Sequence, residues 1–284
     1  MSLTSLQSIR LFCIDVDGTL YVDSKVVDGA TELINRISAL KKHVIYLTNN
    51  STLSAEQYAS KIQAYGLPCS PDQVLCTSAV TTNYLLSKYP EKSDVLVLGQ
   101  DGLIDTISAK FTVTPAFNGS YAQLHSKLET NFHKNTTYKA VVVGLSRDCT
   151  FPQLAHVSAV LEDPNVEFIV TNEDATFPCC NSATIPGSGA ITSFLRSSTG
   201  RTPTVIGKPE PRMIRSAMER YGTTKEEVVM IGDRLDTDIL AGKNAGVLSV
   251  LTSEYGIHGK CDVRRLGIEP DLVVDTVKDL VNLI

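Results

Sequence analysis

Short apolar runs alternate with amphipathic stretches along most of the chain. Runs of four hydrophobic residues at 11–14, 44–47 and 228–231 are typical of buried strands. Between such runs, apolar residues recur at helical spacing, as they do from 30 to 40. Strands that alternate with helices pair in parallel through right-handed crossovers. The pattern therefore predicts an α/β fold with a doubly wound parallel sheet and helices on both faces.

The middle of the chain repeats this alternation independently. Its predicted strands are 95–98, 138–145 and 166–171, and its predicted helices are 101–110, 151–162 and 188–199. This spacing predicts a second α/β unit inserted between the two halves of the first. We expect a discontinuous core from 1–81 and 204–284 and an inserted domain from 82–203.

Acidic residues follow the first predicted strand, in the sequence Asp15-Val16-Asp17-Gly18-Thr19. In an open parallel sheet, ligands bind beyond the carboxyl ends of the strands. Two carboxylates at one strand tip concentrate negative charge, which is costly unless a cation is bound there. Magnesium suits such a tip because it takes oxygen ligands and needs only one or two carboxylates. The competing interpretation is a solvated acidic turn.

A second acidic strand end is formed by Gly232-Asp233 and, one helical turn later, Asp238. Acidic residues are also common at helix N-termini, because they interact favourably with the helix dipole. That alternative explains Asp236 well. It explains Asp233 less well, since Asp233 directly follows a buried strand.

Two further strand ends carry groups that suit a phosphate. Thr48, Asn49 and Asn50 offer a hydroxyl, two amides and backbone N–H groups, although a plain turn would use the same residue types. Lys208 follows a short strand and precedes Pro209. A lysine at this edge would offset the charge of a phosphate and hold it beside the acids.

Composition excludes several classes of protein. With 43% hydrophobic and 20% charged residues, the chain is an ordinary globular protein, and its net charge of −5 makes nucleic acid an unfavourable partner. No apolar run reaches the roughly 20 residues that span a bilayer, and the first residues lack the features of a secretory signal. Seven unevenly spaced cysteines do not form a disulfide framework. We therefore expect a cytoplasmic protein with reduced thiols and no membrane partner.

The acidic, threonine and lysine elements, in this order, resemble the motifs of the haloacid dehalogenase (HAD) phosphohydrolases. The long insertion resembles the C2-type cap of the NagD branch. The resemblance to the 4-nitrophenylphosphatase and phosphoglycolate phosphatase family, with pyridoxal phosphatase a close relative, runs from about residue 10 to the end. It is carried by the segments 48–51, 171–178, 186–190, 207–209 and 232–238.

The resemblance implies a role for each motif residue. Asp15 would be the nucleophile that forms an aspartyl-phosphate, and Asp17 would be the general acid and then the general base. Mg²⁺ would be held by Asp15, the backbone carbonyl of Asp17, and Asp233. The resemblance also assigns Asp238 to orienting Lys208 or a metal-bound water. Thr48, Asn49, Asn50 and Lys208 would bind the phosphate.

The resemblance further implies a Mg²⁺-dependent hydrolase of small phosphorylated metabolites, with phosphoglycolate-like acids as the leading substrates. Phe177 falls where the pyridoxal phosphatase relative has a histidine, so it is a candidate substrate contact, although it could equally belong to the cap core. Pyridoxal phosphate, nucleotides, phosphoproteins and transfer to an acceptor other than water remain alternatives, as does a non-catalytic binding role. Members of this branch often pair through their caps, so a homodimer is expected.

Overall fold

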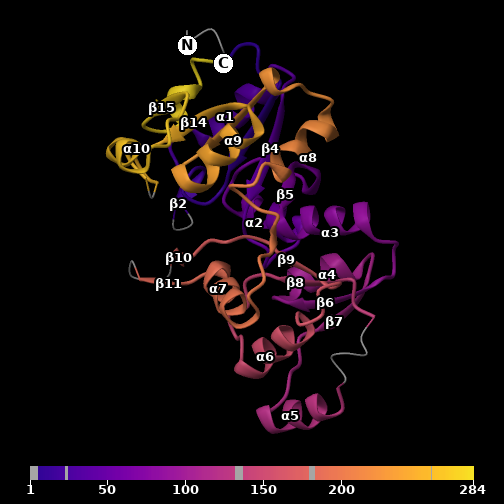
Figure 1. Cartoon of the computed structure of the whole chain (residues 1–284). Helices are drawn as coiled ribbons and strands as arrows, with labels where there is room; N and C mark the ends of the chain where they lie inside the picture. The colour runs from indigo at the N-terminus through magenta and orange to yellow at the C-terminus, as the bar shows by residue number, and fades with distance from the viewer. Residues whose placement is uncertain (1–5, 23–24, 132–136, 179–182, 257) are drawn as a thin grey trace. The chain divides into compact units, whose positions relative to one another are not determined.

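The computed structural model describes residues 6–22, 25–131, 137–178, 183–256 and 258–284. The chain divides into two compact units, drawn with their elements in Figure 1. The first comprises residues 1–48, 55–75 and 207–284, and the second comprises 49–54 and 76–206. The sheets of both units contain parallel strands, which confirms the predicted α/β class. The division at 81/82 and 203/204 stays a prediction.

The first unit is built on a six-stranded sheet in the order β15-β14-β13-β1-β4-β5. These strands are β1 (Leu11–Asp15), β4 (His43–Thr48), β5 (Val74–Cys76), β13 (Val228–Gly232), β14 (Leu248–Thr252) and β15 (Leu272–Val274). Strand β1 pairs in parallel with β13 on one side and β4 on the other. All five of its residues are buried, which explains why it is a continuous apolar run rather than an alternating one.

The α-helices of the unit are α1 (Ala30–Ala39), α2 (Ala55–Ala64), α8 (Arg212–Tyr221), α9 (Leu240–Ala245) and α10 (Lys260–Leu266). Helices α1, α2 and α8 each bury one apolar face. In α8, for example, Met213, Ile214 and Ala217 are buried, and the helix packs on β1 and β4. Gly222 ends α8 with a φ of 57°, a left-handed conformation that glycine adopts without strain.

Short elements complete the first unit. They are the hairpin strands β2 (Tyr21–Val22) and β3 (Lys25–Val26), the single turns η2 (Pro71–Gln73), η5 (Lys225–Glu227) and η7 (Val277–Leu280), and the π-helical turn η6 (Leu235–Ile239).

The second unit has its own five-stranded parallel sheet, in the order β12-β9-β8-β6-β7. Its strands are β6 (Asp94–Leu98), β7 (Thr112–Pro115), β8 (Ala140–Val143), β9 (Glu167–Val170) and β12 (Thr204–Val205), and a separate hairpin joins β10 (Thr176–Pro178) to β11 (Thr184–Pro186). Its helices are α3 (Thr77–Lys88), α4 (Asp101–Ser108), α5 (Tyr121–Glu129), α6 (Phe151–Val160) and α7 (Ser188–Thr199).

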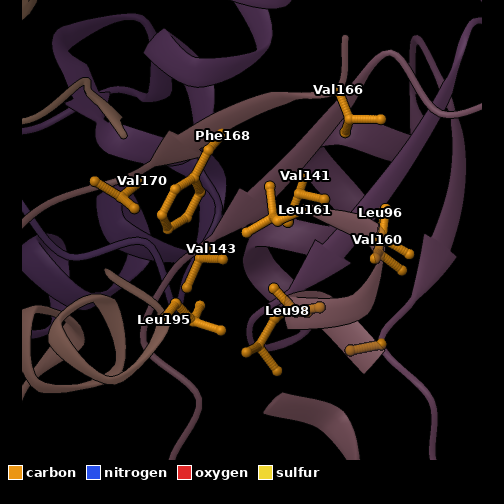
Figure 2. Close-up of a cluster of buried hydrophobic side chains, with 12 residues drawn as sticks. Leu96, Leu98, Val141, Val143, Val160, Leu161, Val166, Phe168, Val170 and Leu195 are labelled. Carbon is orange, nitrogen blue, oxygen red and sulfur yellow. The ribbon is translucent and has the colours of Figure 1, made fainter. Parts of the chain in front are cut away.

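Figure 2 shows the hydrophobic core of the second unit. Leu96, Val141 and Phe168 come from three neighbouring strands, and Val160 and Leu195 come from α6 and α7. All five side chains are almost completely buried. Because the second unit buries a core of its own, the inserted segment is more than a loop on the first sheet.

No helix in the described part of the chain is long and apolar enough to cross a membrane. The cysteines that the structure describes, at 13, 69, 76, 149 and 261, carry free thiols.

Candidate active site

The carboxyl ends of three neighbouring strands carry the predicted chemical groups. Strand β1 ends at Asp15, β4 ends at Thr48, and Asp233 directly follows β13. Because these strands are parallel and adjacent, their carboxyl ends lie at one edge of the sheet. The sheet topology therefore brings together residues that are more than 200 positions apart in the sequence.

Three carboxylates meet at this edge. One oxygen each from Asp15, Asp233 and Asp238 lies within 4.8 Å of the others, and all three side chains are buried. Asp238 reaches the strand end because η6 turns the chain back, with the Arg234 backbone N–H donating to Asp238 Oδ2 over 3.1 Å. A Cβ on Gly232 would lie 2.4 Å from the Asp238 Cβ, so glycine is needed for this approach.

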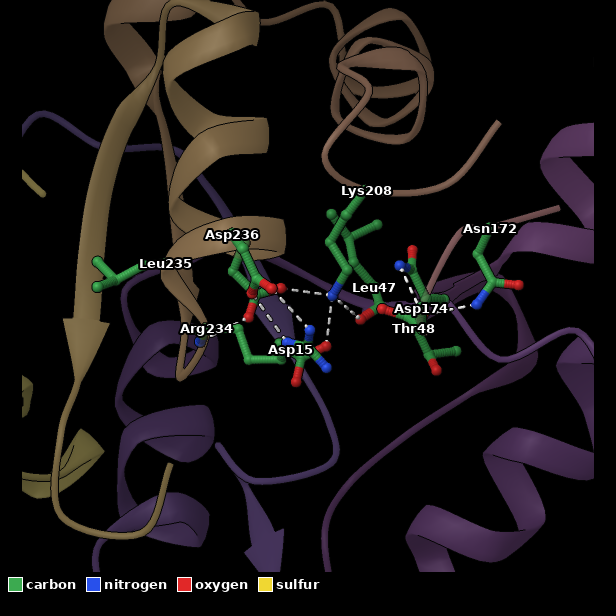
Figure 3. Close-up of polar contacts among 12 residues, drawn as sticks. Asp15, Leu47, Thr48, Asn172, Asp174, Lys208, Arg234, Leu235 and Asp236 are labelled. Atoms are coloured by element: carbon green, nitrogen blue, oxygen red, sulfur yellow. Dashed lines mark hydrogen bonds and ion pairs between the residues drawn. The ribbon is translucent and has the colours of Figure 1, made fainter. Parts of the chain in front are cut away.

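Lys208 is the cation of this cluster. Its Nζ lies 2.5 Å from Asp15 Oδ1 and 2.6 Å from Asp238 Oδ1, and it also donates to the Leu47 carbonyl over 3.3 Å (Figure 3). Burial alone would lower the pKa of Lys208. The two carboxylates more than offset this effect and raise the pKa above its ordinary value. The lysine therefore stays protonated and holds two of the three acids.

The charge of the cluster is not balanced by Lys208 alone. Burial raises the pKa of Asp15 well above its ordinary value, the Lys208 ammonium lowers it, and the carboxylates of Asp238 and Asp233 raise it further. With all three carboxylates ionised, the single ammonium would leave two negative charges in a buried place. A divalent cation would cancel this excess, and carboxylate oxygens are the ligands that Mg²⁺ prefers. The donor set therefore fits the expected metal.

Gly18 shapes the turn that follows Asp15. Its φ is 89°, and a Cβ there would lie 2.7 Å from Asp233 Oδ2. A side chain at this position would be strained in its backbone and would also press on the Asp233 carboxylate. The turn thus leaves room for Asp233 beside the β1 strand end.

Asp17 lies outside the group of three buried carboxylates. Its side chain is 54% exposed, and its Oδ1 lies 3.6 Å from Lys61 Nζ. The two acids of the motif therefore occupy different environments: Asp15 is buried and paired with Lys208, whereas Asp17 is open to solvent. The sequence pattern did not single out Lys61. Its position three residues after the buried Tyr58 puts both side chains on one face of α2, and this spacing was the available signal.

Thr48 is buried at the end of β4, with its Oγ1 3.5 Å from the Tyr58 hydroxyl. The next residues belong to the second unit. The Asn49 amide donates to Asp174 Oδ2 over 3.0 Å, and Asn50 Oδ1 accepts from the Thr52 backbone N–H and hydroxyl, each over 2.8 Å. Asp174, which also accepts from Asn172, lies in the segment 171–178 that carries the resemblance, but the sequence pattern assigned it no role of its own.

Within the second unit, Phe177 lies on β10 and is half-buried. The Arg147 guanidinium lies 5.6 Å from the centre of its ring, a distance typical of cation–π contacts. Glu173, in the same loop, forms an ion pair of 2.7 Å with Arg196. These contacts hold the segment that follows β9.

Comparisons with known proteins agree with this chemistry. A family model described as haloacid dehalogenase-like hydrolase matches residues 12–110, and a second, HAD-hydrolase-like model matches residues 205–280. Phosphoglycolate phosphatase 2 of Arabidopsis thaliana is 32% identical, with 97% of this chain and 93% of the relative aligned.

Two solved structures are similar over nearly their whole length. The p-nitrophenyl phosphatase from Archaeoglobus fulgidus has 26% identity and a TM-score of 0.84, with 97% of this chain and 99% of that one covered. NagD from E. coli K-12 has 25% identity and a TM-score of 0.81, with the same coverage. With its acidic strand ends, its buried lysine and these relatives, the chain belongs to the haloacid dehalogenase-like hydrolases and is a phosphoric monoester hydrolase.

Proposed function

We propose that this phosphatase hydrolyses small phosphomonoesters in a Mg²⁺-dependent reaction with a covalent aspartyl-phosphate on Asp15. The observation that carries the proposal is the pairing of a buried Asp15 with Lys208 inside a cluster of three carboxylates. A lone buried acid would be protonated and unreactive. Here the adjacent ammonium favours the carboxylate that must act as the nucleophile.

The first half of the reaction transfers the phosphoryl group to Asp15. An oxygen of its carboxylate attacks phosphorus, the bond from phosphorus to the ester oxygen breaks, and Asp17 gives its proton to the leaving oxygen. In the second half, water attacks phosphorus and gives a proton to Asp17. Inorganic phosphate leaves, and the Asp15 carboxylate is restored. The exposure of Asp17 suits a group that must reach both a leaving group and water.

Mg²⁺ would be held by Asp15, Asp233 and the backbone carbonyl of Asp17. Asp238, whose Oδ1 lies 2.6 Å from Lys208 Nζ, would orient Lys208 or a water on the metal. When bound, the ion would offset the negative charge of the cluster and of the incoming phosphate. Lys208, Thr48, Asn49 and Asn50 would bind the phosphate oxygens. Of these, Lys208 contributes a full positive charge next to the nucleophile.

Small phosphorylated acids such as phosphoglycolate are the proposed substrate class. This choice is supported by the name of the Arabidopsis relative, which is 32% identical over almost the whole chain. We propose further that residues 82–203 act as a cap that selects the leaving group, with Phe177 as a contact. A phenylalanine cannot supply the hydrogen bonds of a histidine, which disfavours pyridoxal phosphate.

The test is phosphate release from a panel of esters in the presence of Mg²⁺ or of EDTA. The panel contains phosphoglycolate, 4-nitrophenyl phosphate, pyridoxal phosphate, a nucleotide and a phosphopeptide. We expect turnover that requires Mg²⁺, favours the small acid and falls by several orders of magnitude in Asp15→Asn. Rapid acid quenching should trap phosphate on the wild-type protein and none on Asp15→Asn.

Asp236→Asn is the matched control, because Asp236 lies in the same segment but pairs with the Arg234 side chain at 2.9 Å. We expect it to keep nearly full activity. Folded wild-type protein that releases no phosphate from any ester with Mg²⁺ would refute the proposal. Preferred hydrolysis of the phosphopeptide would refute the substrate class alone.

A further inference from the structure

The ammonium of Lys61 is surrounded by three groups of the first unit. Its Nζ lies 5.1 Å from the centre of the Tyr21 ring and 5.5 Å from that of Tyr58, and 3.6 Å from Asp17 Oδ1. Both distances to the rings are within the range of cation–π contacts. The third group is the side chain that the proposed function makes the general acid and base.

The aromatic side of this arrangement is rigid. Tyr58 is completely buried, and Tyr21 is 4% exposed and stacks edge-on against Tyr65, with ring centres 4.7 Å apart. Lys61 follows Tyr58 by three positions on α2, so both side chains lie on one helix face. The two buried rings therefore give the ammonium a rigid surface to pack against.

Tyr21 is also tied to Asp17 through the backbone. The Gly18 N–H donates to the Tyr21 carbonyl over 2.9 Å, which closes the turn that carries Asp17. Burial raises the pKa of Tyr21, and the charge of the nearby Asp17 carboxylate raises it further. The tyrosine, the lysine and the acid thus form one local assembly.

The Asp17 side chain is open to solvent, so its orientation depends on the groups beside it. The side chain is 54% exposed, and an exposed aspartate can exchange among its staggered rotamers. An exposed ion pair between two flexible side chains would restrain the Asp17 carboxylate only weakly. Here one partner is already held by two ring faces, so less side-chain entropy is lost when the pair forms.

We propose that Lys61 is a positioning residue that holds the Asp17 carboxyl group in the orientation needed for proton transfer to the leaving oxygen. The inference rests on the proposed function, because it assumes that Asp17 is the general acid. Proton transfer requires the acid within hydrogen-bond distance of the leaving oxygen, so restricting Asp17 to one orientation increases the reactive fraction. Lys61 acts through Asp17 and takes no part in the bonds that form or break.

The experiment compares two substrates whose leaving groups differ in their need for a proton. An alkyl phosphate such as phosphoglycolate must leave as a protonated alcohol, whereas 4-nitrophenolate is stable without protonation. For Lys61→Met we expect kcat/KM to fall about tenfold with phosphoglycolate and less than about twofold with 4-nitrophenyl phosphate. Lys61→Arg should restore most of the loss, because arginine also pairs with carboxylates and stacks on aromatic rings.

A matched control is Lys127→Met. Lys127 also lies on a helix and over an aromatic ring, 5.5 Å from the centre of Phe117, but in the second unit. The Lys127→Met variant should leave kcat/KM unchanged for both phosphoglycolate and 4-nitrophenyl phosphate. Circular dichroism and the urea midpoint establish that each variant is folded, and Lys61→Gln replaces Lys61→Met if the latter is not.

A double-mutant cycle separates the inference from the proposed function. In an Asp17→Asn background, Lys61→Met should cause no further loss of phosphoglycolate hydrolysis. An equal loss with both substrates, or the same tenfold loss in the Asp17→Asn background, would overturn the role of Lys61 and leave that of Asp17 intact. Full phosphoglycolate hydrolysis by Asp17→Asn alone would instead remove the general acid, and the inference with it.

Discussion

Single residues at the site are held by charge as much as by packing. Lys208 is 3% exposed and contacts two buried carboxylates, and it lies 193 positions from Asp15 along the chain. The sequence indicated that a lysine at this strand end would accompany a phosphate. Its contact with Asp238 depends on the π-helical turn of η6, which residue patterns did not reveal.

Replacement of Lys208 by methionine should destabilise the protein more without metal than with it. The variant leaves three buried carboxylates without a cation, and removal of one partner from a buried ion pair costs about 3–5 kcal/mol. Mg²⁺ would supply positive charge in its place, so the difference from wild type should shrink at saturating Mg²⁺. Urea unfolding with MgCl₂ and with EDTA measures both differences.

Lys243→Met is the control for this prediction, because Lys243 pairs with Asp271 at 2.8 Å but is 37% exposed. We expect it to cost less than about 1 kcal/mol under both conditions. If Lys208→Met lowered the free energy of unfolding equally with and without Mg²⁺, the ion would not be bound beside Lys208.

Among the elements, strand β9 and helix α3 are joined by a polar residue. Glu167, at the start of β9, accepts from the hydroxyls of Tyr84 and Tyr89 over 2.6 and 2.8 Å and from Lys88 over 2.8 Å. Tyr84 and Lys88 belong to α3, so this carboxylate joins α3 to strand β9 of the second sheet. Burial alone would raise the pKa of Glu167. These hydrogen bonds outweigh burial and hold the pKa below its ordinary value.

The contribution of Glu167 to stability should therefore depend on pH. Because its pKa is lower in the folded protein than in the unfolded chain, ionised Glu167 stabilises the fold fully above the ordinary value of 4.5. That stabilisation is lost as the pH falls through the lower folded value. Glu167→Gln should cost about 2 kcal/mol at neutral pH and progressively less in acid. Urea unfolding across the acidic range measures the difference.

Glu91→Gln provides the comparison, since Glu91 is 58% exposed and pairs only with the exposed Lys110 among the contacts described here. It should leave stability nearly unchanged at every pH. A Glu167→Gln difference that stayed constant down to acidic pH would contradict a lowered pKa.

At the scale of the whole molecule, the chain consists of two units with separate cores. The proposed metal ligands all belong to the first unit, because β1, β13 and η6 are parts of it. The expected homodimer stays a prediction.

Binding of Mg²⁺ should consequently protect the first unit selectively. A ligand at 100 times its Kd stabilises the state that binds it by about 2.7 kcal/mol, which corresponds to roughly 100-fold slower exchange of amides that need that unit to unfold. We expect this slowing in β1 and β13 and little change in β8 and β9, measured by hydrogen exchange. Asp233→Asn should abolish it. Equal protection of both units would show that they unfold together.

The amino-acid sequence by itself determined the strand ends, the alternation of elements and the identity of the charged residues. Apolar runs specified β1, β4 and β13, since a central parallel strand is buried on both faces. Asp15 and Asp233 then followed from their places at the ends of those runs, whereas Lys208 follows β12, a short strand of the second sheet. The family was confirmed, as was the α/β class.

Only the tertiary structure decided how these residues meet. Short or weakly apolar elements such as β7, α5 and the β10–β11 hairpin gave no periodic pattern to recognise. The contacts of Lys61 with Tyr21 and of Asp174 with Asn49 join residues 40 and 125 positions apart. Such contacts depend on which faces pack together, because local propensity acts over a few residues, whereas charge and burial act through space.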